Sequence, residues 1–199
     1  AYSRGMEHDA CGVGLVASTE GKKSRKVVEY GIDALKAVFH RGAVDADGKT
    51  GDGAGIHLEI PKDFFIEKIE ITGHKFDSAE ICVGMIFLPR NNFESQETSR
   101  TIIERELTKS NFSIYGWRQV PVNPKVLGEK ADSTRPEIAQ VLFKHNDINL
   151  NGKDLERRLY ETRRKIENEA IKNSLDGLYI CSLSSKSIIY KGMFLAESI

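Results

Sequence analysis

Cysteine is scarce in this sequence: the 199 residues include only three, and none has the close spacing of a disulfide framework or a zinc site. Such a sparse, odd number is typical of a reducing compartment, and we expect a cytoplasmic protein. The histidines share no ligand spacing with a cysteine or a carboxylate, so we expect no bound metal. They are His8, His40, His57, His74 and His145.

An excess of charge of one sign is also missing. The 29 basic and 29 acidic residues give a net charge of zero, so no summed positive field is available to hold a nucleic acid or an anionic membrane surface. No apolar stretch approaches the roughly 20 residues that span a bilayer, and the first residues lack the apolar centre of a signal peptide. With 40% hydrophobic and 29% charged residues, the composition predicts one globular domain.

Cys11 differs from the other two cysteines in its surroundings. Cys82 and Cys181 lie inside apolar, strand-like runs, where cysteine is usually a small buried hydrophobe. Cys11 follows ten residues that resemble a removable leader, and removal of that leader would make it the N-terminus. An N-terminal cysteine offers a thiol nucleophile and an α-amine that titrates at about 7.7–8.0 and can relay a proton. Spacing alone leaves open the alternative that Cys11 is a buried residue of a first strand.

The first half of the chain predicts a strand, a helix, a glycine- and aspartate-rich loop, a second strand and a short helix. Ser24 is suited to cap the first helix and Gly42 to end it, because the apolar residues between them recur at helical spacing. The strands are expected at 12–17 and 56–60, the loop at 45–55 and the short helix around 64–69.

The second half predicts four more strands or strand-like segments and two long helices. The apolar spacing places helices at 94–109 and 152–173, and strands at 81–88, 112–122, 178–183 and 187–190. The last two strands are expected to form a tight hairpin through residues 184–186. Residues 135–145 fit either a strand or a helix. The elements lack the regular strand–helix–strand order of a parallel sheet, so we expect a layered α/β or α+β fold with substantial antiparallel sheet.

Two motifs allow both a structural and a functional interpretation. The glycine-rich segment Thr50–Gly55 could cradle a phosphate, but no Gly-Lys-Ser/Thr follows and the next element is a strand, so a tight turn near an active site is favoured. His40 and Arg41 are expected in the last turn of a helix, where cationic side chains complement the helix dipole. Arg41 would also be able to hold neighbouring loops if this helix end faced Cys11.

Read together, the motifs resemble the bacterial glutamate synthases, in the glutaminase domain of their large subunit. The similarity runs in order along the whole chain. The segments that carry it are 8–14, 40–43, 46–47, 50–56, 116–118, 181–184 and 190–192. The resemblance implies a class II glutamine amidotransferase domain with the N-terminal nucleophile fold, an α+β sandwich of four layers (αββα) with mainly antiparallel sheets. It also implies a leader at residues 1–10 and a partial amidotransferase domain at residues 11–199.

In that family, the residue that matches Cys11 becomes the first residue and its thiolate attacks the side-chain amide of L-glutamine. Ammonia leaves, and water releases glutamate from the thioester. We assign supporting roles in the site to Arg41, Gly42 and Asp52. The segments that hold the glutamine carboxylate and supply oxyanion donors are expected beyond Ile199. The isolated chain should therefore be nearly inactive, because the loss of one oxyanion donor can cost about 100- to 1,000-fold in rate.

The resemblance also implies partners for the complete enzyme. Ammonia passes to a flavin domain of the same subunit, where 2-oxoglutarate becomes glutamate. That half uses FMN and an iron–sulfur cluster, with electrons from NADPH through a small subunit, and none of its binding residues is expected in this chain. Two alternatives remain: the glutaminase of another ammonia-using synthase, and a non-catalytic scaffold domain of the same fold.

Overall fold

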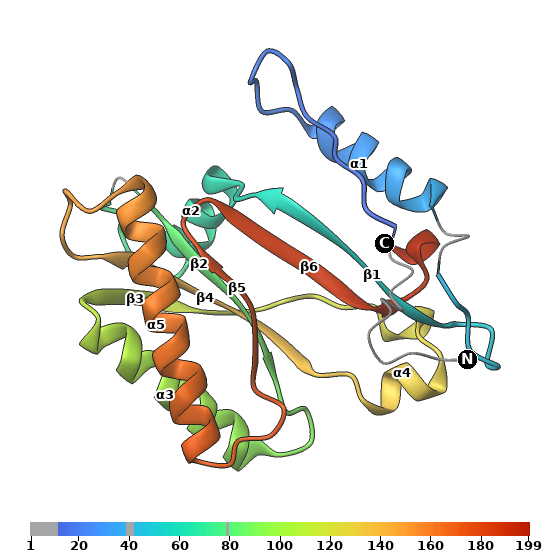
Figure 1. The fold of residues 1–199 in the computed structure, drawn as a ribbon. Helices are drawn as coiled ribbons and strands as arrows, with labels where there is room; N and C mark the ends of the chain where they lie inside the picture. Colours follow the sequence, from blue (N-terminus) through green and yellow to red (C-terminus); the bar gives the residue numbers. More distant parts are fainter. Residues whose placement is uncertain (1–11, 39–41, 79) are drawn as a thin grey trace, which may run out of the picture. The chain divides into compact units, whose positions relative to one another are not determined.

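A computed structural model describes residues 12–38, 42–78 and 80–199, which fold into two compact units (Figure 1). Of the described residues, unit 1 comprises 12–38, 42–56, 123–134 and 191–199. Unit 2 comprises the described residues 57–78, 80–122 and 135–190. Among the helices of these described ranges, none is long and apolar enough to cross a membrane.

Unit 2 contains a four-stranded antiparallel sheet. Its strands lie in the order β3-β4-β2-β5, and each neighbouring pair is antiparallel. The strands are β2 (Cys82–Leu88), β3 (Phe112–Gln119), β4 (Glu137–His145) and β5 (Tyr179–Ser184). The antiparallel pairing confirms the expected α+β class. It also shows that the ambiguous segment 135–145 forms a strand, which lies between β2 and β3.

Two long helices cover one face of this sheet. Helices α3 (Phe93–Lys109) and α5 (Gly152–Lys172) bury their apolar faces in one core with the strands. Ile102, Ile103 and Leu107 are the buried stripe of α3, as the helical spacing predicted. Both helices begin and end within one residue of the positions expected from the sequence. Apolar residues at helical spacing form a continuous face, and this pattern makes such helices recognisable in the sequence.

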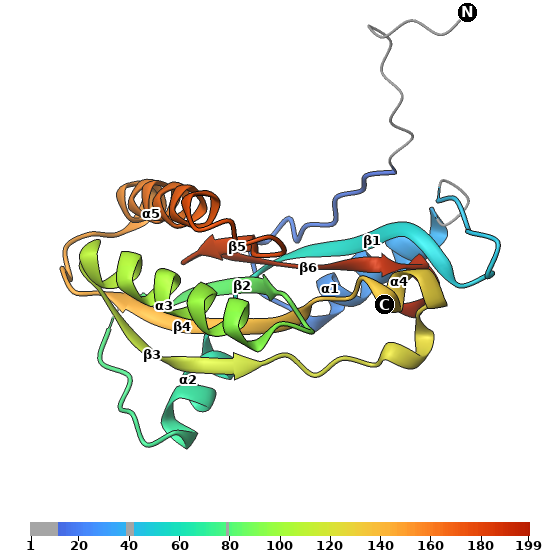
Figure 2. The ribbon, with the colours of Figure 1, turned by 90° about the horizontal axis from the view of Figure 1, so that it is seen from below.

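The opposite face of the sheet carries a second, smaller core. Helix α2 (Lys62–Ile71) inserts Phe65 and Ile69 there, and Figure 2 shows α2 and α5 on opposite sides of the strands. Alternate residues of β2 contribute to the two cores, because side chains of a strand point alternately to either face. Cys82 and Cys181 belong to different cores and are both buried, as predicted.

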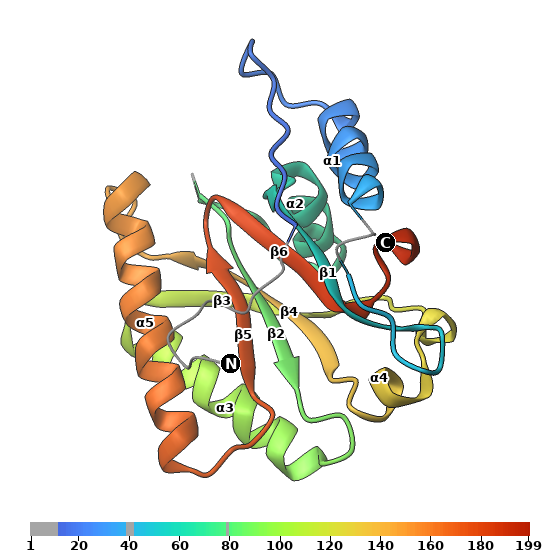
Figure 3. The same cartoon turned by 45° about the vertical axis from the view of Figure 1, so that its right-hand side comes forward.

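Unit 1 contains shorter elements. Helix α1 (Arg25–Ala37) is capped by Ser24, as predicted: the Ser24 hydroxyl accepts a hydrogen bond from the backbone N–H of Lys26. The other elements are α4 (Glu129–Ser133) and the short 3-10 helices η2 (Pro124–Val126) and η3 (Ala196–Ser198). Strands β1 (Thr50–Glu59) and β6 (Ser187–Phe194) pair with each other, and each contributes residues to both units (Figure 3).

Two predicted elements of unit 1, and the predicted end of a helix, were wrong. Residues 12–18 have no regular structure, and Val13 and Leu15 are 92% exposed; a strand needs a hydrogen-bonded neighbour, and none of the described strands pairs with this segment. The predicted loop 45–55 becomes strand from Thr50 onward, because this stretch pairs with β6. Helix α1 ends at Ala37, earlier than Gly42, and residues 39–41 lie outside the described part of the chain.

The predicted hairpin near residue 185 was also wrong. Strands β5 and β6 follow each other closely in sequence but belong to different sheets, since β5 pairs with β2 and β6 pairs with β1. The turn between them is fixed by the carboxylate of Glu156 on α5, which accepts hydrogen bonds from the hydroxyls of Ser184 and Ser185 and from the N–H of Ser185, each at 2.8 Å. These hydrogen bonds hold the turn at which the chain leaves the four-stranded sheet and enters the β1–β6 sheet.

Candidate active site

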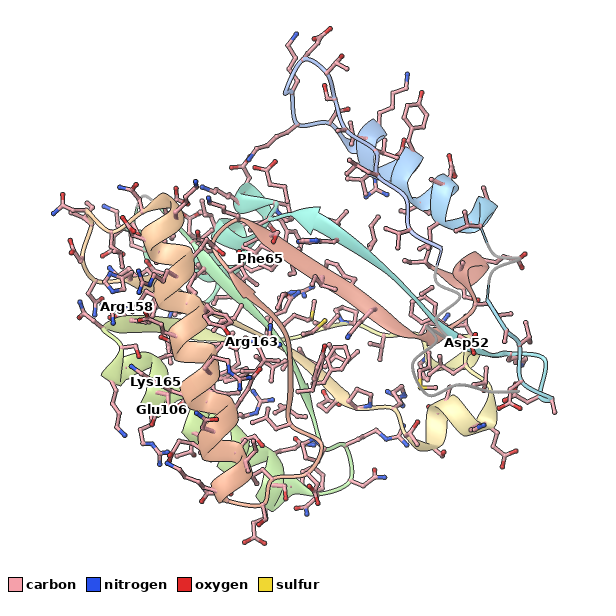
Figure 4. All side chains as sticks on the ribbon, in the orientation of Figure 1. Asp52, Phe65, Glu106, Arg158, Arg163 and Lys165 are labelled. Carbon is pink, nitrogen blue, oxygen red and sulfur yellow. The ribbon has the colours of Figure 1, made fainter. Side chains whose placement is uncertain are left out.

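The structure describes two of the four residues to which the sequence assigned a role in the site. Gly42 lies in an exposed bend, and Asp52 lies on β1 near its beginning (Figure 4). Cys11 and Arg41 lie outside the described residues. The structure therefore describes the candidate site only at Gly42 and in the segment that follows it.

Residues 43–52 form a hairpin, called the 43–52 hairpin below. The N–H of Asp45 donates to the carbonyl of Thr50 at 2.9 Å, and the N–H of Asp52 donates to the carbonyl of Ala43 at 3.3 Å. The Asp52 carboxylate also accepts a hydrogen bond from the N–H of Ala43, with 2.9 Å between Oδ2 and N. Asp52 thus holds Ala43 by its backbone and by its side chain. This double contact fixes the chain at the residue directly after Gly42.

The turn of the hairpin is built around Asp47. Its Oδ1 accepts hydrogen bonds from the N–H groups of Lys49 (2.9 Å) and Thr50 (2.7 Å), and its Oδ2 accepts one from the Thr50 hydroxyl (2.6 Å). The Thr50 hydroxyl and these N–H groups lower the pKa of Asp47 to about 2, because they stabilise the ionised carboxylate. Gly48 has a φ of 68°, a left-handed conformation that glycine adopts without strain.

Helix α4 packs against this turn. Lys130 Nζ lies 2.7 Å from Asp45 Oδ2, and the N–H of Ala131 donates to Thr50 Oγ1 at 3.4 Å. The Lys130 side chain lowers the pKa of Asp45, and Asp45 in turn raises the pKa of Lys130. A Cβ atom placed on Gly128 would overlap Asp47 Oδ2 and Thr50 Oγ1. The N-terminus of α4 and the turn are therefore in direct van der Waals contact.

The glycines of the segment Thr50–Gly55 allow a close approach of strands. A Cβ atom on Gly51 would lie 2.9 Å from the carbonyl oxygen of Phe194, and one on Gly53 would lie 3.3 Å from that of Gly192. Gly53 also has a φ of 118°, which L side chains rarely adopt. Both glycines therefore have a structural purpose in the contact with β6. The tight turn that the sequence favoured for residues 50–55 was wrong: this stretch is strand, and the turn lies before it, at Asp47 and Gly48.

Comparison with known protein families gives the site its context. The family described as glutamine amidotransferases class-II matches residues 11–199, so the match begins at Cys11 and includes both units. The chain belongs to this family. The antiparallel four-stranded sheet of unit 2 and the helices that flank it are consistent with the α+β sandwich of N-terminal nucleophile enzymes that the sequence predicted for a class II amidotransferase.

The relatives of this class II amidotransferase chain are much longer proteins. It is 52% identical over 199 residues to the large chain of an NADPH glutamate synthase from Azospirillum brasilense, and covers 13% of that protein. It is 40% identical over 191 residues to a ferredoxin-dependent glutamate synthase from Pyropia yezoensis, with 94% of this chain and 12% of the relative covered. A ferredoxin-dependent glutamate synthase 1 from Arabidopsis thaliana is 40% identical over 195 residues, with 97% and 12% covered.

Sequence reasoning missed the residues that fasten the hairpin of this amidotransferase domain to α4. Asp47 followed by Gly48 is a common turn signal, so the turn itself was readable from the sequence. Lys130 carried no such signal, because its partner Asp45 lies 85 residues away in the chain. Helix α4 was not predicted either, since its five residues are too few for a helical pattern to appear.

Proposed function

We propose that this chain is the glutaminase part of a glutamate synthase, in which L-glutamine is hydrolysed to glutamate and ammonia. The observation that carries the proposal is the family match, which begins at Cys11 and continues to residue 199. The two glutamate synthase types among the relatives support this choice over the glutaminase of another ammonia-using synthase.

The proposed chemistry starts at Cys11 after removal of residues 1–10. The thiolate of Cys11 attacks the side-chain carbonyl carbon of glutamine, the bond from that carbon to nitrogen breaks, and the α-amine of Cys11 delivers the proton with which ammonia leaves. Water then hydrolyses the thioester and releases glutamate. A free α-amine suits this relay because its ordinary pKa of about 7.7–8.0 leaves part of it unprotonated near neutral pH.

Arg41, Gly42 and Asp52 have supporting roles in the proposed site. The double contact between Asp52 and Ala43 supports such a role for Asp52, because it fixes the backbone next to Gly42. The oxyanion donors and the groups that hold the glutamine carboxylate belong, in this proposal, to residues that follow this segment in the family pattern.

The redox half of the reaction is assigned to other domains of the same subunit, with FMN, an iron–sulfur cluster and a small NADPH-oxidising subunit. The described residues do not fit a cluster: they contain no group of three or more His, Cys, Asp or Glu side chains able to hold a metal ion. Cys82 and Cys181 are buried in different cores. The higher identity to the NADPH enzyme, 52% against 40% for the ferredoxin enzymes, favours NADPH as the electron donor.

The proposal is tested in the full-length, processed protein by Cys11→Ala. Glutamine hydrolysis should fall by about 1,000-fold or more, because no other group replaces the nucleophile. Mass spectrometry should find Cys11 at the N-terminus of the active protein, and a diazoketone analogue of glutamine should add its mass to the peptide that contains Cys11.

Cys181→Ser is the matched control, because this thiol is buried and contacts the carbonyl of Ile189 at 3.6 Å. It should leave the labelling of Cys11 unchanged. An active mature enzyme that retains residues 1–10, or a fully active Cys11→Ala variant, would contradict the proposal. A Cys11 that resists the analogue in the processed protein would favour a non-catalytic scaffold.

A further inference from the structure

Residues 123–134, called the α4 segment below, contact the 43–52 hairpin in three different ways. Lys130 and Asp45 form an ion pair, with 2.7 Å between Nζ and Oδ2. Thr50, only 3% exposed, accepts a hydrogen bond from the N–H of Ala131, which is 4% exposed. Gly128 packs so closely on Asp47 and Thr50 that it leaves no room for a side chain.

These contacts join two stretches of chain that are about 80 residues apart in the sequence. Both stretches belong to unit 1. Thr50 is their centre, since its hydroxyl donates to Asp47 and accepts from Ala131. A shift of the α4 segment would therefore reach the turn through Thr50 and Asp47 together. From the turn, the paired strands of the hairpin lead to Asp52 and Ala43.

We propose that the α4 segment is a positioning element for the glutaminase reaction, because it fixes the hairpin whose Asp52 holds the backbone beside Gly42. This inference rests on the proposed function. The hairpin depends on such support, since most of its residues are exposed and its only fully buried side chain is Thr50. Thr50, Asp47, Gly128 and Lys130 act here through other residues and are not catalytic residues.

Positioning has a measurable consequence for the rate. A displacement of about 1 Å in a group that orients the reactants can cost on the order of 100-fold in rate. An interaction that matters mainly in the transition state lowers kcat more than it raises KM. A purely structural contact would instead lower the melting temperature and leave kcat unchanged in the folded protein.

Gly128→Ala in the full-length enzyme is the sharpest test. Gly128 has φ −75° and ψ 163°, a conformation open to alanine, so the substitution disturbs only the contact with Asp47 and Thr50. We expect kcat for glutamine hydrolysis to fall about 10- to 100-fold with the KM for glutamine within about twofold. Labelling of Cys11 by the diazoketone analogue should slow in parallel. Gly31→Ala is the matched control, because its new Cβ would lie at an ordinary 3.5 Å from Ile56.

Lys130→Met gives a second, milder perturbation, because it removes the ion pair and keeps the length of the side chain. We expect kcat to fall about 3- to 10-fold, less than for Gly128→Ala, because the substitution removes one contact and does not displace the turn. Lys130→Arg should restore most of it, since arginine also pairs with a carboxylate. Lys125→Met is the control from the same segment, because Lys125 is exposed and lies outside the three contacts.

Cys11→Ala, measured alongside, separates the two proposals. A fully active Cys11→Ala variant would overturn the proposed function. An inactive Cys11→Ala variant, together with wild-type kcat and wild-type labelling in Gly128→Ala, would overturn only the positioning inference. The inference would also be overturned if Lys130→Arg were as slow as Lys130→Met, or if Gly128→Ala lost hydrogen-exchange protection across unit 2 as well as activity.

Discussion

The two units of this chain are stabilised by different kinds of contact. Unit 2 buries apolar side chains on both faces of its sheet, in two cores. Within the described residues, unit 1 contributes a single apolar side chain to the fully buried set, Ala131, and α1 has no fully buried residue. Unit 1 depends instead on polar contacts such as those of Asp47, Asp52 and Lys130.

This difference indicates where stability and function reside. Burying one large apolar side chain contributes about 1.5–3 kcal/mol, whereas a typical hydrogen bond contributes about 0.5–1.5 kcal/mol net. Unit 2 should therefore be the more stable part, and unit 1, which carries the candidate site, should open more readily. Functional segments are commonly drawn from the less stable end of a protein.

The largest expected effect comes from Leu159→Ala in unit 2. Leu159 is fully buried in the middle of α5, and its truncation leaves a cavity between that helix and the sheet. We expect a loss of about 2–5 kcal/mol in the free energy of unfolding of unit 2. Native-state hydrogen exchange of the amides of β2 and β4 measures this loss. A change below about 1 kcal/mol would mean that this core is not what stabilises the unit.

Unit 2 was also the part whose structure the sequence predicted well. Long periodic segments such as 94–109 and 152–173 identify themselves, because one apolar face must be buried. The sequence of segment 135–145 does not decide between helix and strand, because its conformation depends on pairing with β2 and β3, which are distant in the sequence. The pairing of β6 with β1 was likewise hidden, because strand partners distant in sequence leave no local signal.

The candidate site was predictable only in part. The resemblance to a family pointed to Asp52, and its contact with Ala43 gives that residue a physical role. The turn at Asp47 and Gly48 had a local signature. The contact with Lys130 had none, because it depends on how the chain returns after 85 residues. The wrongly predicted strand at 12–17 shows the same dependence, since an apolar run forms a strand only where a partner lies beside it.

A matched substitution in unit 1 should have a smaller effect. Leu35 lies on the apolar face of α1 but is only partly buried, so Leu35→Ala removes less contact than the same change at Leu159. We expect a loss of about 1 kcal/mol or less in the local stability of α1, measured by hydrogen exchange of its amides. Exchange in β2 and β4 should not change. An effect of Leu35→Ala as large as that of Leu159→Ala would remove the distinction between the units.

The smallest effect is expected at Tyr115 in unit 2, at high pH. Its hydroxyl donates to Asp77 Oδ1 at 2.8 Å, Asp77 also pairs with Lys144, and the ring lies beside Phe76. Burial, together with the hydrogen bond to Asp77, raises the pKa of Tyr115 to about 12.

Because this pKa is raised above the ordinary value of about 10, the contribution of Tyr115 to stability is complete below pH 10 and is lost as the pH rises through 12. Exchange protection of β3 should therefore decline more steeply over this range in the wild type than in Tyr115→Phe, which has no proton to lose. Tyr160→Phe, at an exposed position of α5, should leave the slope unchanged. Equal slopes in the wild type and Tyr115→Phe would show that the contact between Tyr115 and Asp77 adds nothing to unit 2, whose stability would then depend on its apolar cores alone.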